Sequence, residues 1–219
     1  MKGMLLKHQK PTRIFHWINL IVFLLLFCSG MPMLNKNLQF LAALFGGLEN
    51  AALCHKYLGF FYILAPLVYI VLYFDLFKKF LATISSFDQD DRQWLRVAGG
   101  YLAPLIKGEV PPQGKYNAGQ KLLAWIVIVF SCVLAASGLV MIFYEQFPPR
   151  LVRWLSFVHA FAAVFLSCGV IVHFYLAAIN PSSRGELKTM LGNGYIEEDL
   201  ARRHNLKWYK EMTAGQREE

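Results

Sequence analysis

The stretch VHAFAAVFLSCGVIVHF, residues 158–174, contains no Asp, Glu, Lys or Arg, yet it carries two histidines, His159 and His173. A helix needs about 20 apolar residues to cross the hydrocarbon core of a bilayer, because each residue advances it by about 1.5 Å. This stretch and its apolar flanks reach that length. An imidazole in hydrocarbon is costly without a partner, so an ionisable side chain inside a span is a candidate for function.

Composition places the rest of the chain in the same class. Of the 219 residues 56% are hydrophobic and 16% are charged, and the mean hydropathy is +0.40, which is high for a water-soluble domain. Three further windows are long and apolar enough to span a bilayer. We therefore predict an all-α integral membrane protein, a four-transmembrane-helix bundle, with spans near residues 14–34, 53–77, 122–144 and 152–179.

The spans define the predicted domain organisation. A membrane domain covers residues 1–179 and includes one long connection, residues 78–121, while residues 180–219 form a polar C-terminal tail. The long connection contains GEVPPQGKYNAGQK, residues 108–121, and connections of this length are commonly functional or disordered. The first span is too long for the core of a cleavable signal peptide, so we expect it to remain as a membrane helix.

The basic residues predict the orientation. The 22 Lys and Arg fall in the N-terminal stretch, the long connection and the tail, with four exceptions: Lys36, Lys56, Arg150 and Arg153. By the positive-inside rule, both termini and the long connection face the cytoplasm. The net charge of +8 then reflects topology and affinity for anionic membrane lipid, so we expect no nucleic-acid partner.

The cysteines argue against two kinds of site. The four cysteines occur singly in or at the ends of the spans, and the sequence has neither CxxC nor CxxCH. This pattern does not suit a disulfide framework, and it excludes covalent attachment of a c-type haem.

Four of the six histidines lie in or at the edge of the spans, namely His16, His55, His159 and His173. With the predicted orientation, His16 and His173 share the cytoplasmic depth, while His55 and His159 share the external depth. His159 and His173 are fourteen residues apart, so they project from nearly one helix face, about 21 Å apart along the axis. His8 and His204 lie outside the spans, and we interpret them as solvated.

Two histidine pairs at two depths match the needs of two b haems. The iron of each takes two axial nitrogens on opposite sides of a flat macrocycle, and flanking helices can supply them. A zinc or copper site would instead gather three or four ligands at one place. Gly59 and Gly169, each one turn from a histidine, would give the macrocycle room, although helix packing explains them equally well.

Five segments in order carry a family resemblance: RIFHWIN (13–19), CHKYLGFFY (54–62), GKYNAGQK (114–121), HAFAAVFLSCGVIVHFYLA (159–177) and HNLKWYKEM (204–212). In these segments the sequence resembles the gamma, or cytochrome b556, subunit of respiratory membrane-bound formate dehydrogenases, within the prokaryotic di-haem cytochrome b family. GKYNAGQK is the most specific of them. The first external connection and the long loop follow the family less closely.

The resemblance implies the roles of individual residues. It places an external haem iron between His55 and His159, and a cytoplasmic haem iron between His16 and His173. It also implies a menaquinone or ubiquinone site beside the cytoplasmic haem, formed by Asn117, Gly119, Gln120 and His173. Asn117 has a second reading as the N-cap of the third span, and both readings can hold at once.

The resemblance also implies a function and partners. Electrons would pass from an iron–sulfur subunit and a molybdopterin catalytic subunit, with Mo or W, through both haems to quinone in the bacterial cytoplasmic (inner) membrane. This transfer would contribute to the proton motive force, and the complexes could form a higher oligomer. Formate oxidation would take place on another subunit, because this chain has no cysteine set for iron–sulfur clusters and no domain for a molybdopterin.

Two alternatives stand beside this interpretation. The same di-haem, quinone-reactive cytochrome could serve a hydrogenase or a sulfur-compound reductase. A weaker alternative from another class is a haem-free transporter or membrane anchor whose histidines relay protons. The presence or absence of low-spin b haem in the purified protein separates these two classes.

Overall fold

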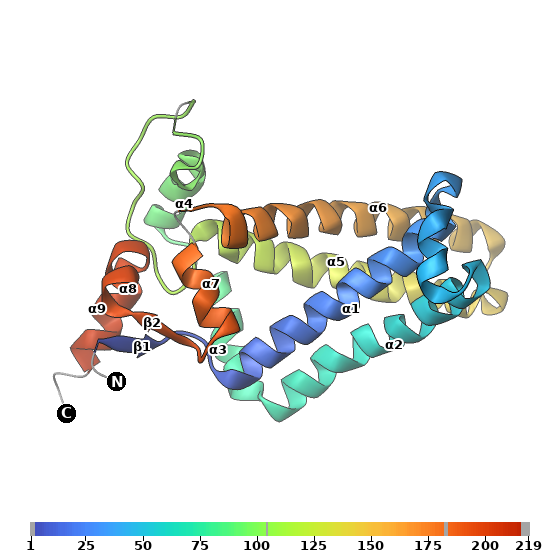
Figure 1. Ribbon diagram of the computed structural model, residues 1–219, viewed down its shortest axis with the longest axis horizontal. Coiled ribbons are helices and arrows are strands. Elements are labelled where there is room, and N and C mark those ends of the chain that lie inside the picture. The colour runs from blue at the N-terminus through green and yellow to red at the C-terminus, as the bar shows by residue number, and fades with distance from the viewer. Residues whose placement is uncertain (1–2, 104, 182–183, 216–219) are drawn as a thin grey trace. The chain divides into compact units, whose positions relative to one another are not determined.

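The computed structural model describes residues 3–103, 105–181 and 184–215. Helices dominate it, and two short strands complete it (Figure 1). In chain order the elements are β1 (Met4–Leu6), α1 (Lys10–Leu34), the 3-10 helix η1 (Lys36–Phe45), α2 (Leu48–Leu72), α3 (Phe74–Ser85), α4 (Gln89–Arg96), the 3-10 turn η2 (Ala98–Gly100), α5 (Ala118–Ile142), the 3-10 turn η3 (Tyr144–Gln146), α6 (Pro149–Phe174), the π-helical turn η4 (Tyr175–Ile179), α7 (Arg184–Leu191), β2 (Tyr195–Glu197), α8 (Glu198–His204) and α9 (Leu206–Gly215).

Four helices are long and apolar enough to cross a membrane: α1, α2, α5, and α6 with its continuation η4. Three of them have 25 residues and the fourth has 31, which exceeds the length that a bilayer requires. Many apolar side chains on these helices are exposed, for example Val71 at 79%, as expected for helices that lipid surrounds. The predicted all-α membrane fold with four spans is confirmed.

The second long helix ends earlier than the sequence suggested. Tyr73 leaves helical geometry, with φ −131° and ψ 44°, and α3 begins at Phe74. Because α3 places Asp75, Lys78 and Lys79 among apolar residues, it is amphipathic and unlike a spanning helix. The apolar run that predicted a span to residue 77 therefore belongs to two helices.

The chain divides into two compact units, each described by itself. The bundle unit comprises Ile14–Phe74 and Val127–Val172, and the strand unit comprises Met1–Arg13, Asp75–Ile126 and His173–Glu219. Most of each long helix belongs to the bundle unit. The sequence-based division into a membrane domain and a tail stays a prediction.

Side-chain contacts join the helices of the bundle unit. Two aromatic stacks and one hydroxyl pair connect α1 with α2, α2 with α5, and α5 with α6. They are Phe15 on Tyr69 (ring centres 4.2 Å apart), Tyr62 with Ser131 (hydroxyl oxygens 2.7 Å apart) and Phe130 on Phe165 (ring centres 4.6 Å apart).

In the strand unit, the N-terminal residues pair with the tail. β1 and β2 form an antiparallel ladder in which Leu5 lies opposite Ile196, and these two residues share a small core with Ala201 and Trp208. Beside this core lies the buried side chain of Lys7. Its ammonium group donates hydrogen bonds to a carboxylate oxygen of Glu186 at 2.8 Å and to the side-chain oxygen of Asn205 at 2.7 Å.

A second buried ion pair fixes the start of α4 against the start of α5. The Lys121 ammonium lies 2.7 Å from a carboxylate oxygen of Asp91, and both side chains are less than 10% exposed. Lys121 also donates to the carbonyl of Ser86, and the indole N–H of Trp125 donates to the carbonyl of Ile84. A buried charge is tolerated when it is paired and hydrogen-bonded, and Lys121 meets both conditions.

Candidate functional site

The rings of His55 on α2 and His159 on α6 meet within the bundle unit. Their centroids lie 6.2 Å apart, and their planes are inclined at 73°. These are the two histidines that the sequence assigned to the external depth. The structure brings them together.

A serine on a neighbouring helix contacts each ring. The Nδ1 atom of His55 lies 3.0 Å from Oγ of Ser29 on α1, and the Nδ1 atom of His159 lies 2.9 Å from Oγ of Ser137 on α5. Each serine hydroxyl also donates to the carbonyl four residues earlier in its own helix, at 2.7 Å for Ser29 and 2.6 Å for Ser137. The hydroxyl proton is thus used, so each serine oxygen accepts from the imidazole.

The partners of Nδ1 fix the tautomer of both rings. The Nδ1 atom of His55 also lies 3.1 Å from the carbonyl oxygen of Leu26, which can only accept a hydrogen bond. In His159 the partner is Ser137, whose proton is already donated to Val133, so Nδ1 carries the proton in each ring. Nε2 therefore keeps its lone pair, as a metal ligand must.

Glycines make room for the rings. A Cβ atom added at Gly30 would lie 3.0 Å from Cε1 of His55, and one added at Gly138 would lie 3.4 Å from Cε1 of His159. At Gly59, one turn after His55, an added Cβ would meet nothing within 4 Å. Gly59 therefore leaves the surface of α2 open one turn from His55.

The separation of the two rings suits the two axial ligands of one iron. The ring centroids lie 6.2 Å apart, which leaves room between the rings for two metal–nitrogen bonds of about 2.0 Å each. Within the described part of the chain, no three or more His, Cys, Asp or Glu side chains gather as a metal centre. Two imidazoles alone suit an iron whose remaining ligands come from a macrocycle.

The other two predicted ligands lie in different units. His16 lies on α1 in the bundle unit, where its ring makes an edge contact with Trp17 at 5.4 Å between centroids. His173 lies near the end of α6 and begins the last segment of the strand unit. Their pairing at one iron stays a prediction.

The predicted quinone residues form the start of α5. The side-chain oxygen of Asn117 accepts from the backbone N–H of Gln120 at 2.8 Å, and the side-chain oxygen of Gln120 accepts from the backbone N–H of Asn117 at 3.0 Å. This reciprocal pair is a capping box, so the N-cap reading of Asn117 is confirmed. Gly119 lies against Trp94, because an added Cβ would be 2.6 Å from the indole.

The C-terminal tail holds the loop that precedes this cap. The amide nitrogen of Asn205 donates to the carbonyls of Gly114 and Lys115, and the backbone N–H of Lys207 donates to the carbonyl of Gln113. Burial, together with the charge of nearby Lys7, lowers the pKa of the Lys115 ammonium group. Two of the sequence segments with a family resemblance, residues 114–121 and 204–212, are thus in direct contact.

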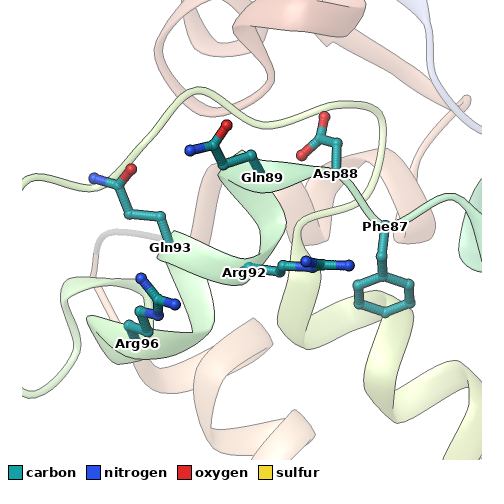
Figure 2. A pocket seen from close by; sticks show the side chains of 6 residues that line it. All are labelled: Phe87, Asp88, Gln89, Arg92, Gln93 and Arg96. Carbon is teal, nitrogen blue, oxygen red and sulfur yellow. The ribbon is translucent and has the colours of Figure 1, made fainter.

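A surface pocket of about 480 Å³ lies elsewhere, along α4 in the strand unit (Figure 2). Its lining residues are Phe87, Asp88, Gln89, Arg92, Gln93 and Arg96. Figure 2 shows Arg92 directed toward Phe87 and away from Arg96, so the two guanidinium groups do not converge on one point. The pocket contains none of the predicted site residues.

Comparison with known proteins supports the resemblance. A family model described as prokaryotic cytochrome b561 matches residues 7–193. The cytochrome b556(Fdn) subunit of the nitrate-inducible formate dehydrogenase of Escherichia coli is 28% identical over 215 residues, which cover 95% of this chain and 92% of the relative. The cytochrome b556(fdo) subunit of an E. coli formate dehydrogenase is also 28% identical, over 95% of this chain and 93% of the relative. The cytochrome b556 subunit of a Haemophilus influenzae formate dehydrogenase is 27% identical, over 98% and 86%.

Proposed function

The chain belongs to the prokaryotic cytochrome b561 family, and from this premise we propose that it is the membrane cytochrome b subunit of a formate dehydrogenase complex. The relatives that carry this name match it over nearly their whole length. In this role the chain passes electrons from an iron–sulfur subunit to quinone. Formate is oxidised on a separate molybdopterin subunit with Mo or W.

The paired rings of His55 and His159 carry this proposal. A b haem bound between them would supply a one-electron carrier. The chain's own contribution is to hold the two imidazole rings 6.2 Å apart between centroids with Nε2 unprotonated, while each Nδ1–H donates to an oxygen atom of a neighbouring helix. His16 and His173 are proposed as the ligands of a second haem at the other depth.

A quinone site is proposed at the start of α5. Asn117, Gly119 and Gln120 form a polar turn at the end of an apolar helix, and His173 belongs to the same unit. Such a turn can donate to a quinone carbonyl, which an apolar helix cannot do. The ring would be that of menaquinone or ubiquinone.

The charge distribution supports an orientation with both termini on the cytoplasmic side of the bacterial inner membrane. Electrons would then move inward from the external pair of histidines. Moving one charge across the membrane stores about 2.3 kcal/mol per 100 mV of potential, so this transfer would contribute to the proton motive force.

The proposal is tested on the complex purified with its partner subunits. A pyridine haemochrome assay should give two b haems per copy of this chain, and formate should reduce both in the absence of quinone. A soluble quinone analogue should reoxidise them. A colourless chain would overturn the proposal in favour of the haem-free alternative, and reduction by hydrogen but not by formate would reassign the partner to a hydrogenase.

A further inference from the structure

We infer that Ser29 with Gly30 on α1, and Ser137 with Gly138 on α5, are two equivalent seats that position His55 and His159 and set the reduction potential of the iron between them. This inference rests on the proposed function, because it assumes that these two histidines hold a haem. The four residues are assigned as positioning residues, since they act through the imidazoles and not on the iron.

The repetition of the arrangement carries the inference. In each seat the serine oxygen contacts Nδ1 of the histidine and the carbonyls three and four residues earlier in its own helix. The two carbonyls are those of Leu26 and Leu25 for Ser29, at 3.2 and 2.7 Å, and those of Leu134 and Val133 for Ser137, at 3.3 and 2.6 Å. The following residue is a glycine, and an added Cβ would lie 3.0 Å from Cε1 of the same ring at Gly30 and 3.4 Å from it at Gly138.

The seats are also buried in a way that leaves the hydroxyls no solvent. Ser29 is 0% exposed and Ser137 is 1% exposed. A hydroxyl in such surroundings is costly unless it is hydrogen-bonded, and here its donor and acceptor capacities are both used. The two Ser-Gly dipeptides of the sequence are the two seats.

Ser167 on α6 shows that a buried serine in this bundle need not contact a histidine. It is 7% exposed, and its hydroxyl donates to the carbonyl of Ala163 at 2.7 Å in its own helix. The side-chain hydrogen bonds of the described residues include none between Ser167 and an imidazole. Ser167 therefore provides a matched control for substitutions in the seats.

The seats should affect the iron through Nδ1. An Nδ1–H group that donates to oxygen makes the imidazole a stronger electron donor at Nε2, which stabilises the ferric state and lowers the reduction potential. The serine oxygen also limits ring rotation, so it helps to fix the 73° between the two ring planes. Loss of the serine hydroxyl should raise the reduction potential of the iron and allow the imidazole ring to rotate more freely.

The first experiment compares Ser29→Ala, Ser137→Ala and the double variant with Ser167→Ala in the purified complex. We expect haem to be retained in all four, and the midpoint potential of the external haem to rise in the seat variants. For scale, a rise of about 59 mV in the midpoint potential of a one-electron carrier changes its ferric-to-ferrous ratio at a fixed potential tenfold. The rise should be larger in the double variant than in either single variant. The low-spin ferric EPR signal of the external haem should shift in the seat variants. The cytoplasmic haem in these variants, and both haems in Ser167→Ala, should keep the midpoint potentials and EPR signals of the parent.

A second experiment uses the glycines as a graded test. Gly30→Ala places a methyl group 3.0 Å from its histidine ring, whereas Gly138→Ala places one at 3.4 Å. Gly30→Ala should lose occupancy of the external haem, because its methyl group lies closer than ordinary contact, whereas Gly138→Ala should lose less or none. Equal and full occupancy in both would contradict the spatial part of the inference.

The proposed function and the inference about the seats would be overturned by different results. If the parent complex has no haem between His55 and His159, then His159→Ala leaves its spectrum unchanged and the proposed function is overturned. If the parent has that haem, but the serine variants match Ser167→Ala in both potential and EPR signal, then the seats are overturned while the proposed function stands.

Discussion

A histidine inside a membrane span requires partners for both ring nitrogens. In His55 and His159, each Nδ1 donates to a serine, and that of His55 also to a backbone carbonyl, so Nε2 keeps its lone pair for the proposed iron. The cost of leaving a polar group unpaired in an apolar interior is of the order of 1–3 kcal/mol. The seats therefore stabilise the fold and, on the proposed function, also prepare the ligands.

Removing one ligand should remove one haem. In His159→Ala the external iron keeps His55 alone, so we expect that haem to be lost or to become high-spin, while the haem assigned to His16 and His173 remains. A haemochrome assay and a reduced-minus-oxidised spectrum measure both outcomes. Loss of both haems with normal helicity, or two haems that both stay low-spin, would contradict the pairing.

Gln120 allows its quinone role and its capping role to be separated. Gln120→Ala removes the capping-box acceptor and should weaken the start of α5 by about 0.5–2 kcal/mol. Gln120→Glu keeps that acceptor oxygen for the N–H of Asn117 but loses the amide donor. If the amide binds quinone, both variants should slow haem reoxidation by a quinone analogue, with both haems retained. Slowing in the alanine variant alone would assign Gln120 to the cap.

The histidines could be predicted from the sequence, whereas their seats could not. Four imidazoles in apolar spans are unusual enough to be noticed, and helix direction gives their depth. A serine in an apolar helix ordinarily bonds to its own backbone, as Ser167 does, so Ser29 and Ser137 give no comparable signal. The Ser-Gly dipeptide, present at both seats, is the sequence feature that could have indicated them.

The start of α5 is easier to predict from the sequence than the short elements are. The sequence indicates Asn117 as an N-cap, and α4 also begins with a capping box, formed by Asp88 and Asp91. The strands β1 and β2 have three residues each, too few to show an alternating pattern, so their pairing was not foreseen.

The tie between α4 and α9 should depend on pH. Hydrogen bonding from Lys207, and from the backbone of Asp91, lowers the pKa of Asp88 from 3.8 to about 2. Burial opposes a rise in the pKa of Lys207, but the hydrogen bonds that its ammonium donates to Asp88 and Asp90 raise it above 10.5. The ion pair therefore stabilises the contact between α4 and α9 fully only between pH 3.8 and pH 10.5. It is lost as the pH falls from 3.8 toward 2, or rises above 10.5.

Hydrogen exchange of the segment around Trp208 measures this dependence. Because the Asp88 side chain is 52% exposed, solvent screening should limit its effect to about 1 kcal/mol or less. After correction for intrinsic rates, protection should fall between pH 5 and pH 3 in the parent chain. Lys207→Met should show lower protection than the parent chain at pH 5, and a smaller further loss of protection between pH 5 and pH 3. An equal loss in both proteins would assign the acid sensitivity to other groups.

At the scale of the whole molecule, the bilayer makes the fold predictable. Lipid leaves backbone groups no solvent partner, so apolar windows of sufficient length must be helices, and four windows gave four helices. The division into a bundle unit and a strand unit is harder to predict from the sequence, because each unit joins segments that are far apart along the chain. Contacts of that kind leave no local pattern.

The predicted orientation can be tested with single cysteines. Glu145→Cys in η3 should react with a membrane-impermeant maleimide added to spheroplasts. Lys210→Cys in α9 should react in inverted vesicles instead, in both cases above the labelling of the parent chain. Both positions lie outside the candidate spans. Reaction of the two cysteines from the same side would refute the four-span topology, and an exchange of sides would reverse the orientation.

The pairing of the first strand with the tail sets an order of assembly. Lys7 bonds to Glu186 and Asn205, which follow it by 179 and 198 residues. A ribosome must therefore synthesise the chain through Asn205 before Lys7 can meet both partners, and closing so long a loop is slow. Until then the nascent chain would display an unpaired strand edge and an unpaired lysine, which proteases and chaperones can recognise. Pairing of β1 with β2 is therefore a late step in the assembly of the strand unit.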